Sequence, residues 1–168
     1  MEAYLIATAC TKFEKKADQT FKSLTEEVYC DLLKSAKVEN GDMIGQAWFG
    51  NCGMGTFGQN NIRGQVCFTP LVQKKLFPER AGIINVEGGC ATGSMAFHGA
   101  WKDVISGTED VSLAIGVEKI YQPNHPEKIQ EIYDGGIDQF DRNDWLDFYK
   151  SVGDELGKPF DPENKKGT

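Results

Sequence analysis

The chain has 168 residues, of which 40% are hydrophobic and 26% charged, and its formal net charge is −7. This length and composition are typical of a globular protein with one domain, or one domain and an appendage. An acidic chain without a clustered basic face is not expected to bind nucleic acid or a membrane surface. The apolar runs are too short to cross a bilayer, and the N-terminal sequence lacks the basic start of a signal peptide. We therefore expect a cytoplasmic protein.

The cysteines indicate free thiols. They are odd in number and irregularly spaced, without a CxxC pair, which argues against a disulfide framework and against a zinc site. We accordingly predict no metal site. The five positions are Cys10, Cys30, Cys52, Cys67 and Cys90.

Apolar runs alternate with amphipathic segments along the first two thirds of the chain. Residues 23–38 show the clearest helical period, and Asn40-Gly41 ends it. The alternation predicts an α/β fold with αβα layers. Strands are predicted at residues 1–11, 43–49, 81–87 and 111–117, helices at residues 23–38, 65–77 and 91–106, and a glycine-rich loop at residues 50–64.

The last part of the chain has a different character. Residues 121–168 are acidic and aromatic and carry little strand pattern. We predict a core over residues 1–120, followed over residues 121–168 by the incomplete start of a loop region.

Gly53 to Gly58 spell a literal GxGxxG after a predicted strand. A dinucleotide site needs a helix that starts inside this motif, so that the helix N-terminus holds the pyrophosphate. The residues that follow, GQNNIRG, are a weak helix start. A mobile glycine loop is therefore the favoured interpretation.

Cys90 stands between a predicted strand and a predicted helix, in IINVEGGCATGS. The unpaired N–H groups at a helix N-terminus favour an anion such as a thiolate. Gly89 and Gly93 permit a sharp turn and the close approach of a substrate, so they are candidate substrate-binding positions. The arrangement is similar to a nucleophile elbow with sulfur in place of the serine oxygen. His98 lies about two helical turns further on and is not placed to act as the base of this thiol. A nucleophile and a small residue in a tight turn both remain open readings of Cys90.

The segment INVEGGCATGSMAFHGAWKDVISGTEDVSLAIGVEKI resembles the active-site region of thiolases, particularly the sterol-carrier-protein-x type branch that includes acetyl-CoA acetyltransferases. Cys90-Ala91-Thr92-Gly93 matches the family pattern C-[AS]-[ST]-G, in which the cysteine is the nucleophile. Gly116-Val117-Glu118-Lys119 matches a later strand end, and Gly58-Gln59-Asn60 matches a family loop. The resemblance covers nearly all of residues 1–120.

The resemblance implies a thiolase-like fold, of which this chain is the N-terminal half with a mixed sheet. It implies an acyltransferase that acts on 3-oxoacyl-CoA or acyl-CoA thioesters through an acyl group on Cys90. Coenzyme A would be a substrate, and no cofactor would be permanently bound. The implied partners are a second copy of the chain, paired through residues 83–87, and in some members a small zinc-ribbon/OB-fold protein.

Two features depart from the family pattern. Glu87-Gly88-Gly89 precedes Cys90, where many thiolases have an asparagine and more polar neighbours. The Gly-His-Pro histidine and the Cys-x-Gly acid/base of the family's second half do not occur, and His125 lies in Asn-His-Pro within the loop region. We expect a piece of a longer protein or one half of a split enzyme. The alternatives are a related condensing enzyme (a ketoacyl or hydroxymethylglutaryl-CoA synthase, or a thiolase-like aldolase) and an inactive thiolase-like scaffold subunit.

Overall fold

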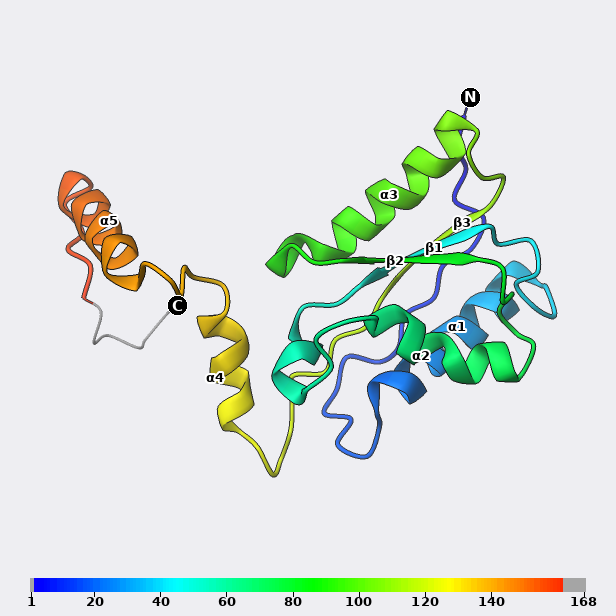
Figure 1. Cartoon of the computed structure of the whole chain (residues 1–168), viewed down its shortest axis with the longest axis horizontal. Helices are drawn as coiled ribbons and strands as arrows, with labels where there is room; N and C mark the ends of the chain where they lie inside the picture. The colour runs from blue at the N-terminus through cyan, green and yellow to red at the C-terminus, as the bar shows by residue number, and fades with distance from the viewer. Residues whose placement is uncertain (1, 162–168) are drawn as a thin grey trace. The chain divides into compact units, whose positions relative to one another are not determined.

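A three-stranded parallel sheet forms the centre of the first part of the chain (Figure 1). The structure is a computed structural model that describes residues 2–161. Its strands are β1 (Gln46–Gly50), β2 (Gly82–Val86) and β3 (Ser112–Gly116), in the order β2-β1-β3. Both strand pairs are parallel and in matching register, so the carboxyl ends of all three strands lie at one edge of the sheet.

Helices cover both faces of this sheet, which confirms the predicted α/β class and its layers (Figure 1). The helix α3 (Thr92–Ser106) packs on one face, and α1 (Phe21–Ala36) and α2 (Arg63–Gln73) lie on the other. The reason is the two-residue period of β1, in which neighbouring side chains point to opposite faces. Trp48 lies against α3 and Phe49 against α2.

Glycines set the distance between the helices and the sheet. A Cβ atom at Gly99 of α3 would lie 2.3 Å from the Trp48 ring, and one at Gly64 of α2 would lie 2.7 Å from Phe49. Real Cβ atoms do not come that close, so both helices approach the sheet through positions that lack a side chain.

The core between the sheet and the α1–α2 layer contains a cluster of aromatic rings. Tyr29, Phe68 and Phe77 pack edge to face, with ring centroids 4.4–5.9 Å apart, and Phe49 meets Phe68 at 6.3 Å. The Tyr29 hydroxyl donates to the Leu76 carbonyl at 3.0 Å, which satisfies the polar end of this buried ring.

On the other face, a buried carboxylate fastens α3 to the strands. Asp103 Oδ2 accepts hydrogen bonds from Trp48 Nε1 and Ser112 Oγ, both at 2.7 Å, and from Gln46 Nε2 at 3.4 Å. Asp103 is 8% exposed, so these donors supply the solvation that water would otherwise give.

The strand predicted at residues 1–11 is wrong for the residues that the structure describes, because residues 2–13 form no helix or strand. Tyr4, Leu5 and Ile6 are each about 70% exposed. Residues 3–9 instead line one side of an apolar groove of about 390 Å³, whose other walls come from α1, α3 and β3. A strand needs a partner edge, which a hydrophobic run alone does not specify.

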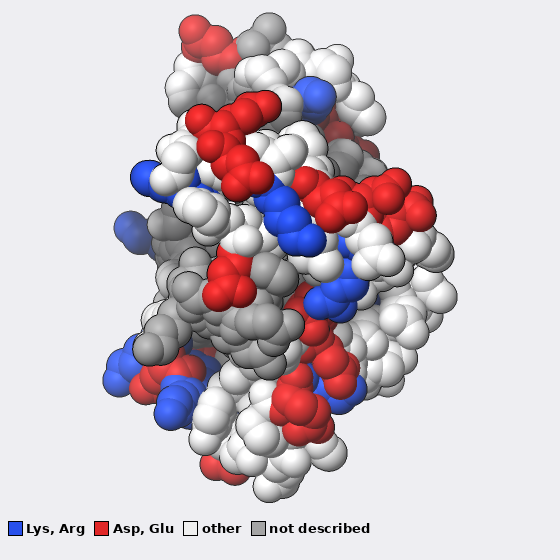
Figure 2. All heavy atoms as spheres, turned by 90° about the vertical axis from the view of Figure 1, so that its left-hand side faces the viewer, with Lys and Arg blue, Asp and Glu red and all other residues white. Residues whose placement is uncertain are grey.

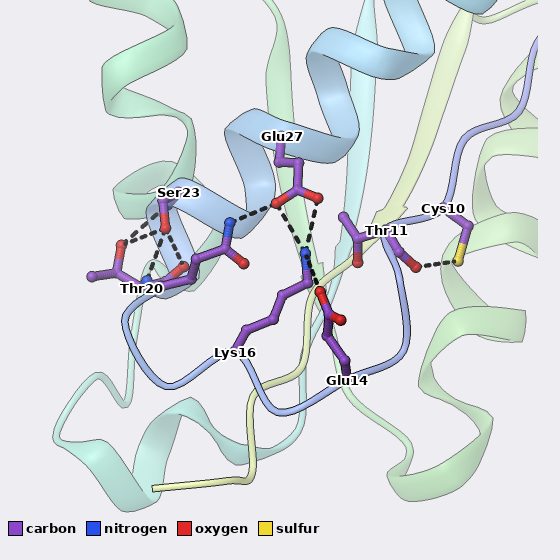
Figure 3. A network of polar contacts seen from close by, with 8 residues as sticks. Cys10, Thr11, Glu14, Lys16, Thr20, Ser23 and Glu27 are labelled. Carbon is purple, nitrogen blue, oxygen red and sulfur yellow. Dashed lines mark hydrogen bonds and ion pairs between the residues drawn. The ribbon is translucent and has the colours of Figure 1, made fainter.

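Polar contacts fasten the chain just before α1 (Figure 3). Thr20 and Ser23 form a capping box at the helix N-terminus. Lys16 Nζ contacts Glu27 Oε1 at 2.9 Å, and Gln19 Nε2 donates to Glu27 Oε2 at 2.6 Å. The hydrogen bond from Gln19, and then the one from Lys16, hold the pKa of Glu27 below its ordinary value.

The contacts divide the chain after Ile129 into two compact units. The second part contains most of α4 (Glu127–Asp134) and α5 (Arg142–Glu155), two helices that the sequence analysis did not predict. Within it, Trp145 stacks on Tyr149 with ring centroids 3.8 Å apart, whereas Phe140 and Phe148 are exposed. Acidic side chains form several patches on the face of the molecule drawn in Figure 2. No helix within residues 2–161 has the length and apolar character needed to span a membrane.

Candidate active site

Cys90 lies at the carboxyl edge of the sheet, in the connection between β2 and α3. It is the middle residue of a short 3-10 helix, η2 (Gly89–Ala91), and α3 follows at Thr92. The thiol is exposed. The structure thus places Cys90 where the sequence pattern predicted it, directly before a helix N-terminus.

The two glycines near Cys90 provide different local geometries. Gly89 has φ +55°, a left-handed conformation that favours glycine, so it makes the turn. A Cβ atom at Gly93, on the first turn of α3, would meet nothing within 4 Å, so this position leaves open space. The roles predicted for Cys90, Gly89 and Gly93 stay predictions.

Asn51, the first residue after β1, joins three elements at the same edge. It is 2% exposed. Its Nδ2 donates to the Val117 carbonyl at 2.7 Å, and its Oδ1 accepts from the Met54 N–H at 2.9 Å. Arg63 Nη1, at the start of α2, donates to the Asn51 carbonyl at 2.7 Å. Asn51 therefore fixes the β1 end relative to β3 through its side chain and relative to α2 through its main-chain carbonyl.

Glu118, after β3, fixes the loop that follows β1. Its Oε2 accepts the N–H groups of Cys52 at 2.9 Å and Gly53 at 3.0 Å, and its Oε1 accepts from Asn51 Nδ2 at 3.2 Å. The loop predicted at residues 50–64 contains a 3-10 helix, η1 (Gly53–Phe57), whose first N–H groups this carboxylate caps. Because α2 begins only at Arg63, the GxGxxG segment does not have the helix start that a dinucleotide site needs.

Lys119 holds the segment before α1 in place. Its side chain is buried, and its Nζ donates to the carbonyl oxygens of Ala17 (2.9 Å) and Gln19. The Glu118-Lys119 pair thus ties the end of β3 both to the loop after β1 and to the segment before α1.

Glu87 connects the Cys52 loop to the Cys90 turn. Its Oε1 accepts the Gly89 N–H at 2.7 Å. The Cys52 thiol donates to the same oxygen, with Sγ 3.7 Å away. Burial, and then the charges of Glu87 and Glu118, raise the pKa of the Cys52 thiol. This second thiol is accordingly held in its protonated form at neutral pH, which makes it a poor nucleophile.

The remaining cysteines and the histidines lie elsewhere. Burial raises the pKa of both Cys67 and Cys30. Cys10 lies in the segment predicted as a strand, residues 1–11, and is exposed. His98 stacks on Trp101 of α3, with ring centroids 5.4 Å apart.

His125 Nδ1 lies 3.1 Å from Glu127 Oε1 on an exposed part of the chain. Within residues 2–161, no three His, Cys, Asp or Glu side chains are grouped so as to hold a metal ion.

The sequence analysis did not single out Asn51, and it named Glu118 only as part of a segment that matches the family pattern, without a role. Asn51 and Glu118 follow closely after β1 and β3. Polar residues directly after parallel strands gather at one edge of the sheet, so this position was the available signal.

Residues 3–146 match the family described as thiolase, N-terminal domain. The chain belongs to this family, and the resemblance given by the Cys90 segment is confirmed. Over 117 residues it is 32% identical to the benzoylsuccinyl-CoA thiolase subunit BbsB of Thauera aromatica, an alignment that covers 70% of this chain and 28% of that protein. It is 33% identical over 122 residues to an acetyl-CoA acetyltransferase of Methanocaldococcus jannaschii, covering 69% and 28%. The aligned part of the chain thus spans less than a third of the length of these relatives.

Proposed function

We propose that this chain supplies the nucleophile, Cys90, of a thiolase-type acyltransferase that acts on acyl-CoA thioesters. The observation that carries the proposal is an exposed thiol at the carboxyl edge of the sheet, directly before α3, within the matched thiolase domain. Covalent catalysis of this kind splits one difficult acyl transfer into two easier steps.

In the proposed thiolysis, the Cys90 thiolate attacks the keto carbon of a 3-oxoacyl-CoA. The bond between C2 and C3 breaks, the acyl group that begins at C3 stays on the sulfur, and the released carbanion takes up a proton at C2 and leaves as acetyl-CoA. The thiol of a second coenzyme A then loses its proton and attacks the thioester on Cys90, which frees the Cys90 thiolate and releases the shortened acyl-CoA. Condensation is the same sequence in reverse.

The proton transfers require groups that this chain is not expected to provide. The family resemblance assigns them to a histidine and a cysteine of the second thiolase half, which we expect either in the same polypeptide or in a separate subunit. The apolar side chains of α3 that are left exposed support a second half that covers them, because Met95, Phe97 and Trp101 are 44%, 54% and 43% exposed. A helix with apolar residues on several sides is typical of a buried position.

A homodimer through β2 is part of the same proposal. Among the described strands, β2 is one of the two outermost strands of the sheet. Its outer side is therefore available for pairing with another strand. The proposal also includes the small zinc-ribbon/OB-fold protein as a partner. Coenzyme A carries several phosphate groups, and this chain has a net charge of −7. We therefore expect the second thiolase half to supply most of the cationic side chains that contact these phosphates.

The test is thiolysis by the chain assembled with its complementary half, with acetoacetyl-CoA and coenzyme A as substrates. We expect turnover by the wild type and by Cys10→Ala, which removes an exposed thiol outside the site, and none by Cys90→Ala. Turnover by Cys90→Ala would refute the proposal. Acylation of Cys90 with condensation but no thiolysis would identify a condensing enzyme instead, and an assembly in which Cys90 is never acylated would be a scaffold.

A further inference from the structure

Besides Glu87 Oε1, which accepts the Gly89 N–H, a second side-chain oxygen holds the turn before Cys90: Thr92 Oγ1. The Gly88 N–H donates to this oxygen at 2.9 Å, and the Thr92 hydroxyl in turn donates to the Gly89 carbonyl at 2.7 Å. The Ala91 N–H donates to the Gly88 carbonyl at 3.0 Å. A single hydroxyl therefore bridges both glycines that precede the proposed nucleophile.

The position of Thr92 is itself fixed by the sheet. The residue is 8% exposed, and its Cγ2 methyl lies against Gly50, the last residue of β1, where an added Cβ would be only 3.0 Å away. β-branched side chains have few accessible rotamers, so contact of the methyl with β1 also sets the direction of the hydroxyl. Thr92 thus contacts the sheet with its methyl group and the Cys90 turn with its hydroxyl, so it holds the turn at a fixed position on the sheet.

We infer that Thr92 is a positioning residue for Cys90, which rests on the proposed function in that Cys90 is taken as the nucleophile. The hydroxyl stabilises the turn in which Gly89 has φ +55°. Without it, the Gly88 N–H and the Gly89 carbonyl lose a partner and reorient toward water. Cys90 then no longer has a fixed place at the N-terminus of α3.

Two substitutions separate the hydroxyl from the methyl. Thr92→Val keeps the shape and the contact with Gly50 but removes the hydroxyl. Thr92→Ser keeps the hydroxyl and removes the methyl. A positioning role predicts that Cys90 reactivity and acyl transfer are impaired in Thr92→Val and close to the wild type in Thr92→Ser. A purely packing role predicts the reverse. Thr92→Ala replaces Thr92→Val if the latter does not fold.

The first measurement does not depend on acyl transfer. In the 168-residue chain, the rate of iodoacetamide alkylation at Cys90 is compared by mass spectrometry with that at Cys10, which is exposed, and Cys67, which is buried and reports on the fold. We expect the Cys90-to-Cys10 ratio to fall about five-fold in Thr92→Val, as for the loss of about one hydrogen bond, and to be retained in Thr92→Ser. Cys67 should stay unlabelled in both variants.

The second measurement is acyl transfer in the assembled enzyme. We expect kcat to fall about 10²-fold in Thr92→Val with KM nearly unchanged, because the thiol is displaced but the substrate still binds. Equal Cys90 labelling ratios in the wild type and both variants, or equal loss in both variants, would overturn the inference. If the labelling ratio responds as expected but no acyl-CoA ever acylates Cys90, the proposed function fails and the positioning role of Thr92 stands.

Discussion

The carboxylate of Glu118, after β3, accepts the main-chain N–H of Cys52, after β1, at a distance of 2.9 Å. The two residues are 66 positions apart in the chain, and the contact holds the β1–η1 loop at the edge where Cys90 also lies. Together with the bond from Gly53, it makes Glu118 the cap of η1.

Glu118→Ala should loosen this loop. We expect amide hydrogen exchange at Cys52 and Gly53 to become at least ten-fold faster, since hydrogen bonds to a charged group contribute about 1.5–3 kcal/mol. Exchange measured by NMR or mass spectrometry checks this, with Glu79→Ala on an exposed turn as the control. Unchanged exchange at both amides would contradict the capping role of Glu118.

The five thiols should differ in reactivity. Exposed Cys90 and Cys10 should be alkylated first, Cys52 and Cys30 later because their pKa values are raised, and buried Cys67 last. Glu87→Gln removes a charge that raises the pKa of Cys52, so it should accelerate labelling at Cys52 and leave Cys30 unaffected. A labelling time course at pH 7 read by mass spectrometry decides the order, and faster labelling of Cys52 than of Cys90 would argue against the assigned site.

Alanine substitutions at two glycines of α3 should change the free energy of unfolding in opposite directions. Gly99→Ala places a Cβ against the Trp48 ring and should destabilise the chain by about 1–3 kcal/mol through overpacking. Gly93→Ala adds a Cβ in open space and should stabilise the helix by about 0.5–1 kcal/mol. Urea unfolding followed by tryptophan fluorescence measures both. If Gly93 borders the substrate, its alanine variant should also show weaker acyl-CoA binding without loss of stability.

The contacts of Glu27 should make stability depend on pH at the acid end. Its pKa is lowered in the folded chain, so its contribution to stability is complete above the ordinary value of 4.5 and is lost as pH falls through the lower folded-state value. Glu27→Gln should therefore be less stable than the wild type at pH 7, and the difference should shrink at pH 3. A difference in unfolding free energy that stays constant between the two pH values would contradict this.

The elements with a strong period were predictable from the sequence. The predicted helix over residues 23–38 corresponds to α1, and the strands predicted around residues 43–49, 81–87 and 111–117 correspond to β1, β2 and β3. The apolar run near Tyr4 was misread, because its pairing depends on a distant strand edge. The helices α4 and α5 were missed, since their aromatic and acidic composition showed no clear core face.

The site was predictable only in part. A thiol between a strand and a helix can be recognised from local sequence, as Cys90 was. The contact of Glu118 with Cys52 joins residues brought together only by the parallel sheet, so no local pattern encodes it. The hydroxyl of Thr92 was hidden for a different reason, since a threonine at a helix start is equally consistent with simple capping.

Acylation of Cys90 tests the central claim most directly. The chain, assembled with its complementary half, is mixed with acetoacetyl-CoA in the absence of free coenzyme A, quenched in acid and digested for mass spectrometry. The account predicts one added acetyl group on the peptide that contains Cys90, removed again by added coenzyme A, and no such group in Cys90→Ala. An acetyl group found on another residue, or a Cys90 that stays unmodified while the substrate is consumed, would contradict it.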